Sequence, residues 1–115
     1  MNSFPKERRL LAKYQFDRVF EKPKRVFFPE FLILFRKKEK AGEARIGLAI
    51  SKKSVNKSTN RNRCKRLVRE SFRLTLLPDV DIIFLSRRGL DNLSNAELNN
   101  KLASAWLKLK HSLKK

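Results

Sequence analysis

The densest set of side chains able to do chemistry is a run of basic residues between positions 51 and 73. This segment holds nine lysines and arginines against one acid, Glu70. At about 100° per residue, a helix over this segment would place a line of polar side chains opposite an apolar face. The polar line contains Asn62, Arg66, Arg69 and Arg73, and the apolar face contains Cys64, Leu67, Val68 and Thr75.

This polar line has the chemistry of a phosphate-binding surface. Guanidinium groups bind phosphate bidentately and stack on bases, and a helix start adds backbone N–H donors with a partial positive charge. Arg61 and Lys65 lie along one flank of the line, and Arg63 lies along the other. Solvated helix faces usually mix charges of both signs. The near absence of acids therefore favours a nucleic-acid interface over an ordinary solvated face.

The same bias extends over the whole chain. Its 115 residues include 29 Lys and Arg against 11 Asp and Glu, which gives a formal net charge of +18. Self-repulsion of this kind destabilises a compact state, and a polyanionic partner offsets it. Nucleic acid, an acidic membrane surface and an acidic protein are the candidates. Nine Phe with one Tyr and one Trp argue against a disordered basic tail.

The cellular compartment is predicted from what the sequence lacks. The longest apolar run, residues 31–35, is too short to span a bilayer. Residues 1–7 lack the apolar stretch of a signal peptide. Cys64 is the only cysteine, so neither an internal disulfide nor a multi-cysteine metal site can form. These features predict a cytoplasmic protein.

The first half of the chain is predicted to contain one short helix and two or three strands. Apolar positions at helical spacing predict a helix over about residues 12–21, ended by Pro23. Residues 26–36 predict one strand, or two short ones broken near Pro29. Residues 37–43 predict a hairpin loop, and residues 45–51 predict another strand. In that strand Gly47 marks a place of close backbone approach.

The second half is predicted to alternate helix, strand and helix. After a basic connection over residues 52–57, Ser58, Thr59 or Asn60 would cap a helix running to about residue 76. Residues 80–85 predict a strand, and residues 87–92 predict a loop. Ser94 and Glu97 predict a capping box for the last helix. The apolar stripe of that helix contains Leu98, Leu102, Ala105, Trp106, Leu109 and Leu113.

This order of elements predicts a two-layer α/β or α+β sandwich. We expect one RNA-binding domain over residues 1–115, with residues 1–11 as a basic N-terminal arm. The sequence shows neither an internal repeat nor a second domain.

The segment over residues 60–70 resembles the signature of the bacterial ribonuclease P protein component. Its pattern is Arg-Asn-Arg, one apolar residue, Lys-Arg, two residues and Arg-Glu, which is highly specific. Residues 45–53 resemble the family's strand before that helix, and residues 10–20 resemble its first helix. The resemblance spans about residues 4–89. Cys64 departs from the usual aliphatic residue, but on an apolar face a buried cysteine acts as a small hydrophobe.

The resemblance implies a mixed sheet of about four strands with three helices. It places the basic helix in a left-handed βαβ crossover, against the usual right-handed preference. It also implies a protein subunit of a ribonucleoprotein endoribonuclease that removes the 5′ leader of precursor tRNA. The implied partners are the catalytic RNA subunit and precursor tRNA, with no membrane and no protein partner. The residues expected to bind the catalytic RNA are Arg61, Asn62, Arg63, Lys65, Arg66, Arg69 and Arg73.

Two phenylalanines one helical turn apart, Phe16 and Phe20, have two interpretations. Composition alone favours core packing. The resemblance implies instead a shallow cleft between the first helix and the sheet that holds the single-stranded leader, where aromatic rings stack on any base. Alignment to the family turns Leu34 and Arg36 toward this cleft. The residues expected to bind the leader are Phe16, Phe20, Leu34, Arg36, Lys52 and Lys53.

The acidic residues do not predict catalysis by the chain itself. RNA hydrolysis by a protein needs clustered carboxylates for a metal or an acid–base pair. Asp79 and Asp81 are the only close pair, and beside Pro78 they favour a loop in contact with solvent. We therefore expect neither catalytic residues nor a metal site in the protein. The resemblance implies an active site in the RNA subunit, with Mg²⁺ bound mainly by that RNA.

Two other functions are compatible with the composition. A ribosomal or other structural RNA-binding protein would bind RNA without affecting cleavage of precursor tRNA. A basic membrane-surface protein would need an amphipathic helix with basic flanks. The last helix is the only candidate for that role, and core packing explains its stripe better.

Overall fold

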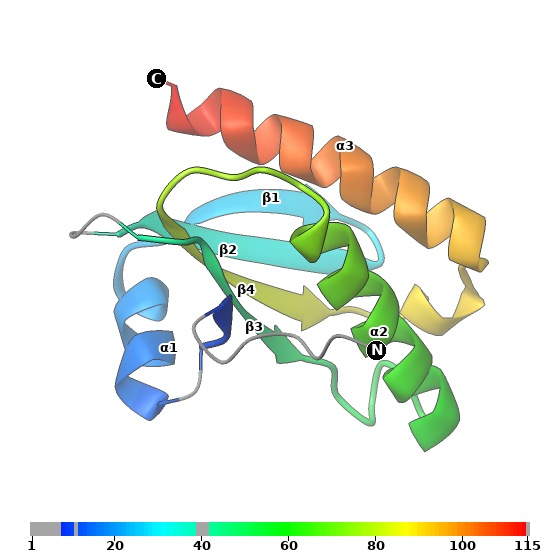
Figure 1. The fold of residues 1–115 in the computed structure, drawn as a ribbon. Helices are drawn as coiled ribbons and strands as arrows, with labels where there is room; N and C mark the ends of the chain where they lie inside the picture. Colours follow the sequence, from blue (N-terminus) through cyan, green and yellow to red (C-terminus); the bar gives the residue numbers. More distant parts are fainter. Residues whose placement is uncertain (1–7, 11, 39–41, 115) are drawn as a thin grey trace.

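The computed structural model describes residues 8–10, 12–38 and 42–114. Over these residues the chain forms three α-helices, one short 3-10 helix and four strands (Figure 1). Their order is α1 (Lys13–Glu21), β1 (Lys24–Phe28), β2 (Phe31–Lys37), β3 (Arg45–Ala49), α2 (Ser58–Arg73), β4 (Val80–Ser86), η2 (Leu90–Asn92) and α3 (Asn95–Leu113).

The four strands form one mixed sheet in the order β1-β2-β4-β3. β2 is antiparallel to both β1 and β4, whereas β3 is parallel to β4. The predicted hairpin loop over residues 37–43 is therefore wrong, because β4 lies between the two strands that this loop would join. β4 is buried on both faces over most of its length, which is typical of a central strand.

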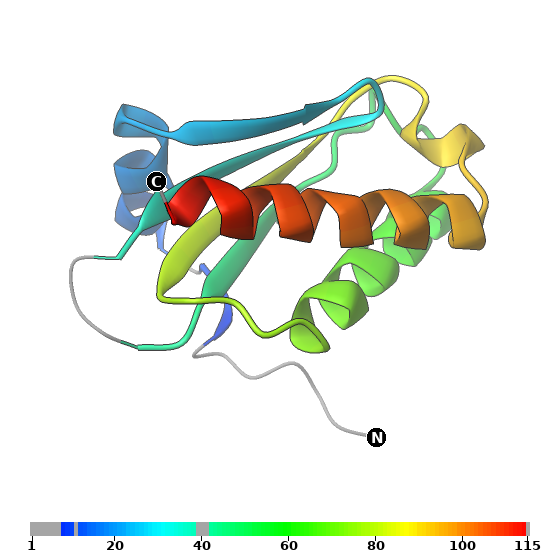
Figure 2. The ribbon, with the colours of Figure 1, turned by 90° about the horizontal axis from the view of Figure 1, so that it is seen from above.

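The β3–α2–β4 unit is a left-handed crossover. α2 and α3 cover one face of the sheet, and α1 lies against the other (Figures 1 and 2). When α2 is toward the viewer and both parallel strands point up, β4 lies to the left of β3. The left-handed crossover implied by the family resemblance is thus present, against the usual right-handed preference. It places the basic helix α2 on the face of the sheet opposite α1.

Alternation along the strands divides the apolar side chains into two cores of unequal size. The larger core joins one face of the sheet to α2 and to the predicted stripe of α3, with Trp106 at its centre. The smaller core lies beneath α1 and contains Leu10, Val19, Leu34 and Ile83. Because α1 is only nine residues long, it covers only part of its face of the sheet.

The two long helices differ in how they are capped at their N-termini. α3 begins with the predicted capping box, in which the Ser94 hydroxyl accepts from the Glu97 N–H at 3.1 Å. α2 begins after Lys57 without a side-chain cap, so the predicted cap at Ser58, Thr59 or Asn60 is wrong. It also ends at Arg73 rather than near residue 76.

The buried side of α2 differs from the predicted one at its end. Because the helix stops at Arg73, Thr75 lies outside it. Phe72 takes the buried position instead, in line with Cys64 and Val68. Its ring packs edge-on against Trp106 at 6.0 Å between centroids.

Part of the predicted N-terminal arm packs on the edge of the sheet. The Leu10 N–H donates to the Ile46 carbonyl at 3.0 Å, and Leu10 is buried. The Arg8 guanidinium lies 4.6 Å from the centroid of the Phe72 ring. Residues 8–10 therefore cover the outer edge of β3, and the rest of the arm, residues 1–7 and 11, lies outside the described residues.

Candidate nucleic-acid interface

The outward face of α2 presents polar and basic side chains away from the sheet. Asn62 and Arg66 are exposed, and neither has a hydrogen bond or an ion pair among the described residues. Lys65 is half-buried on the flank. Arg69 is also half-buried, and its burial, followed by the positive charge of Arg9, lowers the pKa of its guanidinium. Arg66 and Arg69 thus leave positive charge on this face that no acid in the described part of the chain pairs with.

Three other arginines of α2 have partners within the protein. Arg61 donates to the carbonyls of Val55 and Asn56 at 3.0 and 2.7 Å, which fixes the loop before the helix. Arg63 donates to the Asn95 side chain at 2.6 Å and so ties α2 to the start of α3. Arg73 forms an ion pair with Glu70.

The predicted RNA-binding set is therefore not uniform. Arg61 and Arg63 hold loops in place, while Arg66 projects freely, although the sequence gives all three the same residue type. Any contact of the first two with RNA has to use guanidinium N–H groups that the loops leave free.

Phe16 and Phe20 differ in burial. The Phe16 ring lies directly over Gly47, where an added Cβ would come within 2.5 Å of two ring atoms. This confirms the close approach predicted at Gly47. Phe20 remains 46% exposed. One ring is thus partly core, and the other presents an open aromatic surface beside it.

The two strand residues predicted for the cleft are both engaged with α1. Leu34 is only 5% exposed and packs beneath the helix, so it supports the cleft from below. Arg36 donates to the Arg18 carbonyl at 2.8 Å and pairs with Glu21 at 3.4 Å. Arg36 therefore anchors the end of α1 and stays half-buried.

Asp81 is buried, and the predicted loop-and-solvent role is wrong for it. Its two carboxylate oxygens accept from the Arg45 guanidinium at 2.9 and 2.8 Å, and Arg18 lies 3.6 Å away. This ion pair links β4, β3 and α1 on the same face of the sheet as Phe16. The sequence signal that could have indicated this burial is the position of Asp81 between Val80 and Ile82, inside the strand β4.

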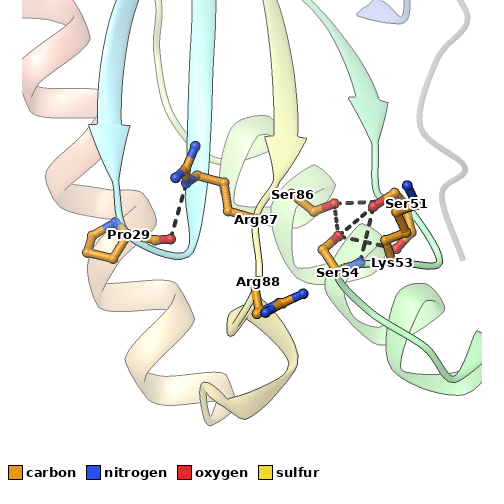
Figure 3. A pocket seen from close by; sticks show the side chains of 7 residues that line it. All are labelled: Pro29, Ser51, Lys53, Ser54, Ser86, Arg87 and Arg88. Carbon is orange, nitrogen blue, oxygen red and sulfur yellow. Dashed lines mark hydrogen bonds between the residues drawn. The ribbon is translucent and has the colours of Figure 1, made fainter.

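A basic pocket of about 420 Å³ lies where β3 and β4 end (Figure 3). Ser51, Ser54 and Ser86 form a hydrogen-bonded cluster within it, with 2.8 Å between the first two hydroxyls. Its other lining residues are Pro29, Lys53, Arg87 and Arg88. Lys53 was predicted from the sequence, whereas the two arginines were missed, although Arg-Arg-Gly directly follows an apolar strand. Lys52 is exposed in the adjoining turn.

The described surfaces present mainly basic and aromatic side chains. The described residues contain no group of three or more His, Cys, Asp and Glu side chains able to hold a metal ion. None of the described helices has both the length and the apolar character needed to cross a membrane. Cys64 is fully buried, and this burial raises the pKa of its thiol.

The fold and its surfaces define a class: a basic α+β protein with a cationic helix on one side of its sheet and exposed aromatic residues on the other. The family model for ribonuclease P matches residues 4–110. The ribonuclease P protein component of Legionella pneumophila (strain Corby) is 52% identical over 109 residues, which cover 95% of each chain. The corresponding protein of Photorhabdus laumondii is 46% identical over 106 residues, covering 90% of this chain and 88% of the other.

The solved structures that resemble this chain are also RNase P proteins. The Staphylococcus aureus RNase P protein superposes with a TM-score of 0.81 at 25% identity, covering 90% of this chain and 95% of the other. The Thermotoga maritima protein superposes with a TM-score of 0.75 at 28% identity, covering 87% and 96%. The chain belongs to the ribonuclease P protein component family and is a protein subunit of ribonuclease P.

Proposed function

We propose that the protein binds the catalytic RNA of ribonuclease P through α2 and the 5′ leader of precursor tRNA on the α1 side of the sheet. By holding both, it assists endonucleolytic removal of the leader. The observation that carries this proposal is the separation of the two surfaces. Asn62 and Arg66, which have no partner among the described residues, belong to α2 on one face of the sheet, and the exposed ring of Phe20 belongs to α1, which lies against the other face (Figure 2).

Each surface suits a different RNA. Cations on a helix bind phosphates of a folded RNA without reading its bases. An aromatic ring instead needs an unstacked base, which a single-stranded leader provides. Lys52 and Lys53 follow β3 at the far end of the α1 side, where they can bind leader phosphates.

The catalytic step belongs, in this proposal, to the RNA subunit with its Mg²⁺. The state of Asp81 in the close pair Asp79 and Asp81 supports this division, because its carboxylate is buried and accepts from or pairs with two arginines. The positive protein lowers the repulsion between the two RNAs, which also eases Mg²⁺ binding by the catalytic RNA. The complex would act in the cytoplasm with its RNA partners.

A reconstitution experiment tests this function. Precursor tRNA is incubated at low Mg²⁺ with the protein alone, with a catalytic RNA alone and with both. We expect cleavage at the mature 5′ end only when the two are combined. Metal-dependent cleavage by the RNA-free protein, lost in Asp79→Ala, would show that the protein is the catalyst. Binding of ribosomal RNA without any effect on cleavage would instead support a structural RNA-binding role.

A further inference from the structure

The α1 side of the sheet continues as an open surface beyond α1. Strand register places one row of side chains across all four strands at the end away from the helix. None of these side chains is fully buried, in contrast to the neighbouring row that contains Leu34 and Ile83. The open row consists of Phe27, Leu32, Leu85 and Ala49.

Phe27 is the aromatic residue of this row. It is 59% exposed, and the Arg87 guanidinium lies 4.9 Å from the centroid of its ring. Arg87 is itself fixed in place, because its backbone N–H donates to the Glu30 carbonyl and its Nε donates to the Pro29 carbonyl. Figure 3 shows this arginine reaching from the end of β4 toward the β1–β2 turn.

The pocket next to this ring is basic. Arg87 and Arg88 line the basic pocket together with Lys53, and none of the described residues lining that pocket is acidic. The nearest carboxylate in the turn, that of Glu30, pairs with Lys101 of α3 at 3.3 Å. A single exposed phenylalanine is ordinary on a protein surface, but an open ring with a fixed guanidinium and a cationic rim is suited to a nucleotide.

We propose that Phe27 and Arg87 form an additional stacking position for an unpaired nucleotide of the leader. The inference rests on the proposed function and extends the leader path past α1. A base stacks on the open part of the ring, as bases do on aromatic residues of single-strand-binding proteins. The guanidinium of Arg87 adds cation–π contact and binds the adjacent phosphate.

The position is distinct from the aromatic pair on α1. Phe27 lies in the Leu32 row, two residues along the strands from the Leu34 row that α1 covers, which corresponds to about 7 Å. In this proposal the leader runs from α1 toward Phe27, so only a leader long enough to extend beyond α1 reaches it. The proposal therefore predicts a dependence on leader length that Phe20 does not share.

The experiment measures affinities of the reconstituted holoenzyme for precursor tRNAs with leaders of increasing length and for mature tRNA. For Phe27→Ala we expect a loss of about fivefold or more for long leaders, with no change for the shortest leader or for mature tRNA. Phe27→Tyr keeps the ring and should restore the affinity, whereas Phe27→Leu keeps apolar volume and should not. Leu107→Ala removes a similarly exposed apolar side chain from α3, which covers the other face, and serves as the matched control.

Each other outcome overturns the inference or its foundation. Equal losses for short leaders, long leaders and mature tRNA would assign Phe27 a structural role. Unchanged affinity for long leaders in Phe27→Ala, with a clear loss in Phe20→Ala, would remove this position but keep the proposed function. If Phe20→Ala also leaves every leader unaffected, the leader path itself is wrong.

Discussion

The outward face of α2 and the α1 side of the sheet differ in the side chains that they offer to RNA. The α2 face carries charge without aromatic rings, and Arg66 stands on it without a partner among the described residues. The α1 side carries Phe16, Phe20 and Phe27, and the Arg87 guanidinium lies beside the last of these rings. The first surface is expected to bind phosphates with strong salt dependence. The second is expected to bind unstacked bases mainly by stacking on its aromatic rings.

Residue type alone does not determine whether an arginine of this protein is available to bind RNA. Arg66 is free to bind RNA, whereas Arg63 bridges α2 to α3 and Arg45 neutralises a buried carboxylate. The α1 side is built by such internal pairs, because Asp81 and Arg36 both hold α1 to the sheet. Substitutions can therefore separate the two surfaces.

The largest effect is expected for Asp81→Ala, which disrupts the α1 side alone. Removing this buried carboxylate leaves Arg45 and Arg18 without their shared anion. The free energy of unfolding should fall by about 3 kcal/mol in urea denaturation. Asp79→Ala, its half-buried neighbour outside the strand, is the control and should cost much less. Equal costs for the two variants would contradict the structural role of the ion pair.

Gly47→Ala tests the support beneath Phe16. The new Cβ would lie 2.5 Å from two atoms of the Phe16 ring, so the ring must move away from β3. We expect a loss of stability of about 1–3 kcal/mol together with weaker binding of precursor tRNA. In a Phe16→Ala background the same substitution should cost far less, because the clash is gone. Additive costs in this double-mutant cycle would show that the two positions do not interact.

The sequence alone was sufficient to predict the helices and strands, the basic face of α2 and the close approach at Gly47. Helical periodicity and capping residues are local signals, so α3 and its Ser94 cap were predictable. The insertion of β4 between β2 and β3 was not, because strand order depends on long-range pairing. For the same reason Asp81 was expected to contact solvent rather than to be buried, since its partners Arg45 and Arg18 are distant in the sequence. Family resemblance, rather than periodicity, supplied the left-handed crossover.

A comparison of Arg66→Ala with Arg63→Ala should separate RNA contact from internal support. Arg66→Ala should weaken binding of the catalytic RNA and lower the magnitude of the log–log salt slope by about 0.7–0.9 per lost contact. Its stability should not change. Arg63→Ala should lower the stability by about 1 kcal/mol, because its bonds to the η2–α3 connection are lost. Lys114→Ala, at the exposed end of α3, controls for net charge.

The smallest effect is expected at Cys64, which tests whether the charge of α2 reaches its buried side. Arg63 alone would lower the pKa of the thiol, but burial is the larger influence and raises it. The thiol should therefore stay protonated at neutral pH and resist iodoacetamide until the protein unfolds. Rapid labelling of the native protein, at a rate similar to that of the urea-unfolded chain, would contradict this burial.

The most direct test of two separate RNA surfaces is the affinity of one holoenzyme variant, Phe20→Ala, for two ligands. Because Phe20 is about half exposed, its loss should leave folding and binding of the catalytic RNA intact. Affinity for precursor tRNA should fall by about 1–3 kcal/mol, whatever the leader sequence, while affinity for mature tRNA stays the same. Equal losses for precursor and mature tRNA, with a lower melting temperature, would place Phe20 in the core and contradict the account.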